Sequence, residues 1–264
     1  MDKTAAQRYN TAPDAALGRV EEMIASALSN AAPDTRVPIF FRADDIGVIS
    51  DNFLNLITIF QDHHMPLCMA VVPTWLTRAR WETIKEHTDP SLPLWCWHQH
   101  GWNHTNHEAV GKKHEFGQSR TDESIRRDLT SGRQKLEAII GSDFTPVFTP
   151  PWNRCSNRTL EILAQLQFHG ISRSRGEQKQ PAPLPDLYIN VDLHTRKETK
   201  PAAGLNNLCC EFEQAIGDGQ VGIMLHHQRM NGNSLVFLDG LLDIIATYPP
   251  LQPTGFNHLL IRNE

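Results

Sequence analysis

The sequence lacks the features that would assign it to several common classes of protein. It has no run of 18 apolar residues, so we expect no membrane-spanning helix. It has no dense run of Lys and Arg, and its formal net charge is −5. This charge argues against a general nucleic-acid binder and against a basic protein of the membrane surface. No Gly-x-Gly-x-x-Gly motif or phosphate loop follows an apolar run, which weakens a nucleotide-binding interpretation.

Cysteine is scarce and has no pattern of a disulfide framework. The chain has five cysteines, an odd number, and no Cys-x-x-Cys motif. The N-terminus lacks a positive region followed by an apolar block, so as it stands it is not a secretory signal. We therefore expect free thiols and a reducing, cytoplasmic compartment, although a signal peptide removed beforehand would give the same sequence.

The remaining composition is that of an ordinary globular protein. Apolar residues make up 40% and charged residues 21% of the 264 residues. These proportions allow a proper core and make long disorder unexpected. The length suits a single α/β barrel.

Short apolar runs alternate with segments of helical periodicity along most of the chain. Residues Thr121–Ile140 are the clearest helix, because Thr121 is a suitable cap and apolar residues recur on one face up to Gly141. Such alternation predicts a parallel sheet with helices outside it, either a barrel or a doubly wound open sheet. We expect strands at 37–41, 67–72, 94–97, 147–148, 187–191 and 221–225, and further helices at 11–29, 53–60, 159–168 and 234–245.

Polar residues follow most of these apolar runs. Asp44 and Asp45 come after the first run, and the sequence HQHGWNHTNH follows the third. TPPWNR, Asp192-Leu-His194 and His226-His227 follow later runs. Because chemistry in parallel α/β folds collects at the carboxyl ends of strands, their repeated occurrence there predicts a functional site.

The histidine cluster favours a metal site. His100 and His104 are four residues apart, so in a helical turn they would share a face, and His-x-x-x-His commonly binds one zinc. One carboxylate from the Asp44-Asp45 pair would complete three protein ligands and leave the open position of a catalytic zinc. Taken singly, each motif also has an ordinary reading as a turn, a helix cap or a solvated pair.

The order of these motifs resembles that of the polysaccharide deacetylase family, the nodulation-type carbohydrate esterases. The matching stretches are RADDIG, HGWNH, FTPPWNR and IMLHHQ, within a region from Pro38 to His227. The resemblance implies a distorted (β/α)7 barrel. We expect a catalytic barrel over residues 36–264 and an extra helix, packed on the barrel, within residues 1–35.

The resemblance also implies a role for each motif residue. Asp44 would be the catalytic base and His226 the general acid, and Asp45, His100 and His104 would bind one divalent metal. Pro151 and Trp152 would form a groove wall, with the Trp152 N–H holding the oxyanion, and Leu225 would line a pocket for the acyl methyl.

One position departs from the family pattern. The third motif normally opens with an arginine that pairs with the catalytic base, and this chain has Thr149 there. The candidates for a substitute cation are Arg42, Arg154, Arg173 and Arg175. Arg42 is nearest in sequence and should point to the opposite side of the strand from its immediate neighbours. We expect Asp192 to orient the catalytic histidine.

The resemblance implies an enzyme that removes an N-acyl group, most simply acetyl, from an amino sugar of a glycan or of a precursor in surface-polysaccharide synthesis. The expected cofactor is Zn²⁺, with Co²⁺ or Ni²⁺ fitting the same ligands. Trp102 is a candidate face for a sugar ring. The alternative is a barrel that binds metal and glycan without efficient turnover. Hydrolysis of another bond, such as a cyclic amide or a phosphoester, ranks below both, and the sequence does not predict the oligomeric state.

Overall fold

The computed structural model describes residues 5–32, 34–89, 91–177 and 182–261. Its centre is a parallel sheet in the order β5-β4-β3-β2-β1-β7-β6, and β8 pairs with the beginning of β1. The strands are β1 Val37–Ile46, β2 Leu67–Val71, β3 Trp95–His100, β4 Phe144–Thr149, β5 Gly170–Ile171, β6 Val191–Asp192, β7 Val221–Leu225 and β8 Leu251–Pro253.

One stretch of chain bridges the gap between the two edge strands of the sheet. Asp186 and Ile189 form isolated parallel bridges with Ile171 and Ser174, on the β5 side. The same chain then enters β6, which pairs with β7. The sheet is therefore rolled into a barrel whose wall is irregular between β5 and β6.

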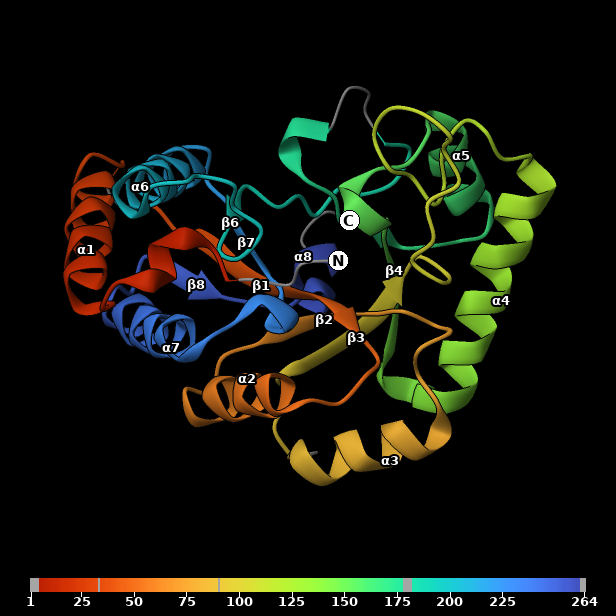
Figure 1. Cartoon of the computed structure of the whole chain (residues 1–264), viewed down its shortest axis with the longest axis horizontal. Helices are drawn as coiled ribbons and strands as arrows, with labels where there is room; N and C mark the ends of the chain where they lie inside the picture. The colour runs from red at the N-terminus through yellow and green to blue at the C-terminus, as the bar shows by residue number, and fades with distance from the viewer. Residues whose placement is uncertain (1–4, 33, 90, 178–181, 262–264) are drawn as a thin grey trace.

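Helices α1 to α7 surround the strands, whereas α8 lies near the centre of the view in Figure 1. Side-chain caps mark where several of them begin: the hydroxyl of Ser50 accepts from Phe53 N–H, and that of Thr121 accepts from Ser124 N–H. The helices are α1 Asp14–Ser29, α2 Asp51–Asp62, α3 Arg78–His87, α4 Asp122–Ile140, α5 Asn157–Gln165, α6 Pro201–Gly217, α7 Gly232–Thr247 and α8 Phe256–Ile261, with short 3-10 turns η1 Gln7–Asn10, η2 Gly141–Asp143, η3 Pro151–Asn153, η4 Arg175–Glu177 and η5 His227–Arg229.

The strand residues alternate between two cores, as a period of two requires. On β1, Ile39 and Phe41 belong to the large apolar cluster shared with the helices. Phe40 lies inside the barrel with Cys68 and Phe256. Further along β1, the same inward face carries Arg42 and then Asp44, both buried. The apolar cluster around Phe40 therefore lies beneath a layer of polar side chains at the carboxyl ends of the strands.

The N-terminal part of the chain packs against the outside of the barrel. Helix α1 contacts α6 and α7, and the η1 residues Arg8 and Tyr9 are buried with hydrogen bonds to the Leu193 carbonyl. The first four residues of the predicted extension lie outside the described residues. No helix in the described part of the chain is long and apolar enough to cross a membrane.

The predicted barrel is confirmed, and the differences lie in its details. The segment predicted as a strand at 187–191 is regular only at Val191–Asp192. The sequence reading missed β5, β8 and helices α3, α6 and α8. Helix α3 buries only Trp81 and Ile84, too few apolar positions to establish a period.

Candidate active site

A bulge at the end of β1 brings two consecutive carboxylates to the same place. Adjacent strand residues normally point to opposite faces. The pairing of β1 with β2 shifts register between Ala43 and Ile46, and Asp45 has a φ of 64°. This left-handed residue turns the Asp45 side chain toward the barrel mouth beside Asp44, as β-bulges near active sites commonly do. A non-glycine residue in this conformation costs about 1–3 kcal/mol, which is typical of functional sites.

The two predicted histidine ligands are held by a strand and a loop rather than by a helical turn. His100 is the last residue of β3. The chain then turns at Gly101, with φ of 61°, and His104 also has a positive φ of 57°. The expectation of a helical turn is therefore wrong. The loop nonetheless folds back, so that the His100 and His104 ring centroids lie 5.2 Å apart.

Asp45, His100 and His104 converge on one point. The Asp45 Oδ1 lies 3.3 Å from His100 Nε2 and 3.2 Å from His104 Nε2. Ligand atoms about 2.0–2.1 Å from a tetrahedral zinc would be separated by about 3.3–3.4 Å. Together, the three side chains form the one metal-ligand cluster found among the described residues.

The hydrogen bonds of this cluster also fit a cation. The Nδ1 of His100 lies 3.0 Å from the Thr149 carbonyl, so Nδ1 carries the proton and the Nε2 of a neutral ring is an acceptor. It faces Asp45 Oδ1 at 3.3 Å. Burial acts to lower the pKa of His100, but hydrogen bonding to Asp45 and the charges of Asp44 and Asp45 outweigh it and raise the pKa. A positive charge, either a proton on Nε2 or a metal cation, therefore belongs between these two atoms. These residues therefore suit a divalent metal, with His100 Nε2, His104 Nε2 and Asp45 Oδ1 as its ligands.

The electrostatics of the cluster keep its ligand atoms available. Burial, together with the charge of His100, lowers the pKa of His104 to about 4, so this imidazole is neutral at pH 7. For Asp45, burial acts to raise the pKa, but the hydrogen-bonding and positive charge of the surrounding histidines outweigh it and lower the pKa. A neutral imidazole and an ionised carboxylate are the forms that bind metals.

Arg42 supplies the cation beside Asp44. Its Nε lies 2.7 Å from Asp44 Oδ1 and its Nη2 2.8 Å from Oδ2, a bidentate pair. The guanidinium also donates to the Ser172 carbonyl and to the Asn153 side-chain oxygen. Burial acts to raise the pKa of Asp44, but the charge of Arg42 lowers it below its usual value. The ion pair comes from within β1, because residues 42 and 44 share the inward face.

Thr149 has a different set of partners. Its hydroxyl lies 2.9 Å from His98 Nε2, and its carbonyl accepts from His100 and from the N–H of Gly101. Thr149 occupies the position of the family arginine, and it orients His100, a candidate metal ligand.

The predicted groove wall lies against the metal-ligand cluster. The Trp152 ring centroid is 4.5 Å from that of His104, and Trp152 has a φ of 57°. Within the described ranges, its backbone N–H donates no hydrogen bond, which leaves it available to an oxyanion. Pro151 is buried and sits next to Gly101, where an added Cβ would lie 2.5 Å from the proline ring. This close approach requires glycine.

His226 follows β7 at the same mouth. Its charge contributes to lowering the pKa of both Asp44 and Asp45, so its ring lies near them. Its buried Nδ1 has no hydrogen-bond partner in the described part of the chain. The neighbouring Leu225 is fully buried in the apolar cluster between sheet and helices, so its predicted place in an acyl pocket stays a prediction.

The structure does not bring Asp192 to the His226 ring. The Asp192 carboxylate accepts hydrogen bonds from the N–H groups of His194 and Thr195, and so closes a turn. His194 takes the place next to His226, whose backbone N–H donates to His194 Nδ1 at 3.3 Å. Asp192 therefore holds the turn that carries His194, and its role in orienting the His226 ring stays a prediction. The contact between His194 and His226 was not predictable from the sequence, in which His194 is one more polar residue after an apolar run.

Two further residues shape the site. The Glu115 carboxylate accepts from the backbone N–H groups of Trp102 and Asn103 and so holds the loop that carries His104. Glu115 was not predicted from the sequence, because a single Glu in a polar loop belongs to no recognisable motif. The Trp75 ring lies 5.8 Å from that of His104. Trp102 is half-buried against a second apolar cluster, and its contact with a sugar ring stays a prediction.

Comparison with known proteins identifies the family of the chain. The family model for polysaccharide deacetylase matches residues 32–171, which include β1 to β5. The chain belongs to the polysaccharide deacetylase family. No curated protein matches it.

Several solved structures show the same fold at low identity. A polysaccharide deacetylase from Mycobacterium smegmatis is 15% identical, with a TM-score of 0.60 over 88% of this chain and 92% of that one. A family 4 acetyl xylan esterase from Clostridium thermocellum, in complex with a cobalt ion, is 12% identical, with a TM-score of 0.56 over 85% and 91%. A CE4 family pseudoenzyme from Bacillus anthracis is 11% identical, with a TM-score of 0.52 over 87% and 66%.

Proposed function

We propose that this polysaccharide deacetylase removes an N-acetyl group from an amino sugar, with one divalent metal bound by Asp45, His100 and His104. The observation that carries the proposal is the convergence of these three ligands, 3.2–3.3 Å apart around the Asp45 oxygen, next to a second carboxylate paired with an arginine. A bound divalent cation supplies Lewis acidity that polarises the acyl carbonyl and makes water acidic.

The residues of the site carry out the proton transfers and stabilise the developing negative charge. Asp44 is ionised because its pKa is lowered, and it takes the proton of the attacking water. The Trp152 N–H donates to the oxygen on which negative charge develops. His226 gives a proton to the amine as it leaves, since an amide nitrogen is a poor leaving group without one. Each acid–base group of this kind contributes about 10²–10⁴-fold to the rate.

The structure bears on the alternative, a metal- and glycan-binding barrel without turnover. Its main support was the missing arginine at position 149. Arg42 now provides the corresponding charge to Asp44 through two hydrogen bonds, which favours an active enzyme. The existence of a pseudoenzyme with the same fold keeps the alternative as an explicit outcome of the test.

The test is acetate release from acetylated chito-oligomers and from nucleotide-linked acetylated amino sugars, with and without added Zn²⁺ or Co²⁺. We expect metal-stimulated hydrolysis, reduced by about 10²-fold or more in Asp44→Asn. Asp143→Asn, at an exposed position, is the matched control and should retain activity. Metal binding without hydrolysis of any of these substrates would favour the binding protein. Hydrolysis that survives Asp44→Asn would show that the role given to Asp44 is wrong.

A further inference from the structure

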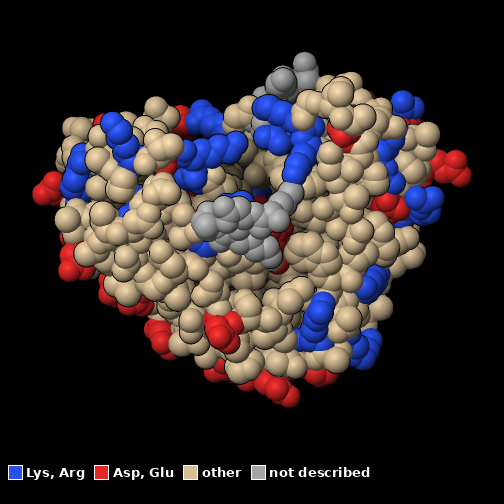
Figure 2. Space-filling model, in the orientation of Figure 1, with Lys and Arg blue, Asp and Glu red and all other residues tan. Residues whose placement is uncertain are grey.

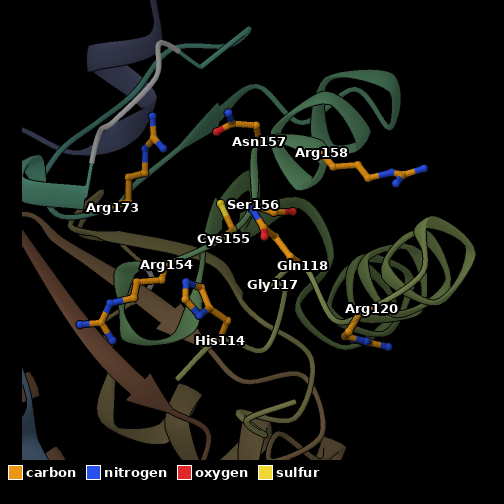
Figure 3. A pocket seen from close by; sticks show the side chains of 10 residues that line it. All are labelled: His114, Gly117, Gln118, Arg120, Arg154, Cys155, Ser156, Asn157, Arg158 and Arg173. Atoms are coloured by element: carbon orange, nitrogen blue, oxygen red, sulfur yellow. The ribbon is translucent and has the colours of Figure 1, made fainter. Parts of the chain in front are cut away.

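The two sides of the barrel mouth differ in what supports them. Figure 2 shows a central hollow with Lys and Arg side chains near its upper rim. Beyond Trp152, residues 154–158 line a cavity of about 570 Å³, where the side chains of Arg154 and Arg158 point away from each other (Figure 3). None of the residues that line this cavity is a candidate metal ligand or catalytic residue, so it contributes no group to the proposed chemistry.

On the side of His226, the N-terminal extension supports the mouth. Its η1 turn contacts both α6 and α7, the helices that precede and follow β7 in the chain. The match to the family model covers residues 32–171, so η1 and His226 both lie outside it. The contact between them is therefore a feature of this chain that the family match does not include.

Arg8 and Tyr9 hold the backbone of the segment that follows β6. The Arg8 Nη2 and the Tyr9 hydroxyl donate to the Leu193 carbonyl at 3.1 Å and 3.2 Å. A carbonyl oxygen has two lone pairs, so these two donors fill its capacity. Both side chains are buried, and a buried guanidinium is stable only where it has hydrogen-bond partners. The turn is therefore fixed in position relative to Leu193.

The next residue, His194, lies between Tyr9 and His226. Its ring stacks on that of Tyr9, with the ring centroids 5.6 Å apart and the ring planes inclined by 25°. Its Nδ1 accepts a hydrogen bond from the His226 backbone N–H at 3.3 Å. Only 1% of His194 is exposed, and close packing leaves such a ring little room to move. A continuous series of contacts thus runs from Tyr9 through His194 to the backbone of His226.

The same turn also holds the chain that follows His226. The Tyr9 carbonyl accepts from the side-chain amides of Asn231 and Asn233, at 3.3 Å and 2.9 Å, and Asn231 caps helix α7. Within the described residues, the buried Nδ1 of His226 makes no hydrogen bond. No partner at this atom orients the ring, so its direction depends on the backbone that carries it.

We propose that Tyr9 is a positioning residue for His226 and acts through its contacts with His194 and the Leu193 carbonyl. This inference rests on the proposed function and assigns the N-terminal extension to one step of it, the protonation of the leaving amine. Proton transfer requires His226 within hydrogen-bond reach of the amide nitrogen. A displacement of about 1 Å at a reacting group can lower a rate about 10²-fold.

Two substrates distinguish a positioning role from a general loss of structure. Hydrolysis of an acetylated chito-oligomer requires a proton for the amine, whereas 4-nitrophenyl acetate releases a phenolate that leaves without one. Tyr9→Leu removes the stacked ring and should lower kcat for the oligomer by about tenfold or more, with KM unchanged. Its kcat with 4-nitrophenyl acetate should equal that of the wild type. Tyr9→Phe keeps the ring and loses one hydrogen bond, so its kcat for the oligomer should fall only about threefold.

Tyr248→Phe is the matched control, because it removes the same hydroxyl group after the far end of α7. It should behave as the wild type with both substrates. Chelator competition should give one metal affinity for all these variants, because the metal-ligand candidates lie at the end of β1, at the end of β3 and in the loop after it. Thermal melts show whether Tyr9→Leu is folded at the assay temperature, and where it is not, Tyr9→Phe alone must show the selective loss.

Two kinetic results would overturn the inference. Equal losses with the oligomer and with 4-nitrophenyl acetate would show that Tyr9 supports only the fold. An unchanged kcat for the oligomer in folded Tyr9→Leu would show that the contacts with His194 do not matter for proton transfer.

A measurement without turnover separates this inference from the proposed function. If the wild type releases no acetate from any acetylated sugar, the proposed hydrolysis is wrong. The contacts are then tested by NMR of the imidazole nitrogens, in which the resonance missing from His226→Gln identifies His226. This resonance should shift in Tyr9→Leu and stay in place in Tyr248→Phe. A His226 resonance that is the same in Tyr9→Leu and in the wild type would overturn the inference whatever the substrate.

Discussion

Replacing Arg42 with methionine should destabilise the protein strongly, because Asp44 would keep its charge in a buried position. Both side chains are almost fully inaccessible, with exposures of 0% and 3%. Removing one partner of a buried ion pair costs about 3–5 kcal/mol. We expect a cost near the upper end of this range, because Arg42 also donates hydrogen bonds to the Ser172 carbonyl and to Asn153 Oδ1. Urea unfolding of the wild type and of Arg42→Met gives the difference directly.

A double-mutant cycle separates the ion pair from the loss of packing. Asp44→Asn leaves Arg42 buried with a neutral partner, and the double variant Arg42→Met, Asp44→Asn removes both charges. We expect the double variant to be more stable than the sum of the single losses implies, with a coupling energy of about 2–3 kcal/mol. Coupling below about 0.5 kcal/mol would refute the reasoning, because residues in contact should not be additive.

Arg42→Lys tests the same interaction through catalysis. Lysine keeps the charge but lacks the planar fork that binds both carboxylate oxygens. Burial, which raises the pKa of Asp44, would then be less well opposed, so the pKa would rise. The acid limb of the pH profile of kcat/KM should move to higher pH. An acid limb that does not move would show that Arg42 does not control the ionisation of the catalytic base.

Three further changes test other parts of the site. Glu115→Gln should weaken metal binding about tenfold, measured by chelator competition, because the loop that carries His104 loses charged acceptors for two backbone N–H groups; unchanged affinity would leave Glu115 with no role in positioning. His104→Ala should remove most of the rise in melting temperature that Zn²⁺ gives the wild type, and an equal rise in both would exclude His104 as a ligand. Burial and the nearby positive groups hold the pKa of His194 well below its usual value, so the unfolded chain binds more protons there and stability should fall as pH decreases below about 6.5. His194→Gln should flatten this dependence by up to about 1.4 kcal/mol per pH unit, and an unchanged slope would contradict the assignment.

The sequence by itself determined the elements of the barrel and the candidates for its chemistry. Apolar runs with polar residues at their carboxyl ends are local patterns, and they place Asp44, His100 and His226 at one mouth because parallel strands end together. Period-two alternation alone puts Arg42 on the same face as Asp44, so the pair was in reach of sequence reasoning. The missed helix α3 shows the opposite case, since two buried residues cannot define a period.

Only the tertiary structure decided how these groups are oriented and what lies next to them. The left-handed turn at Asp45, which aims a second carboxylate into the mouth, depends on the register of β1 against β2 and leaves no trace in residue type. The contact of His194 Nδ1 with the backbone N–H of His226, and the convergence of His100 and His104 on Asp45, arise from contacts between residues far apart in the chain. Such contacts are set by the packing of the whole barrel, which no local pattern of residues encodes.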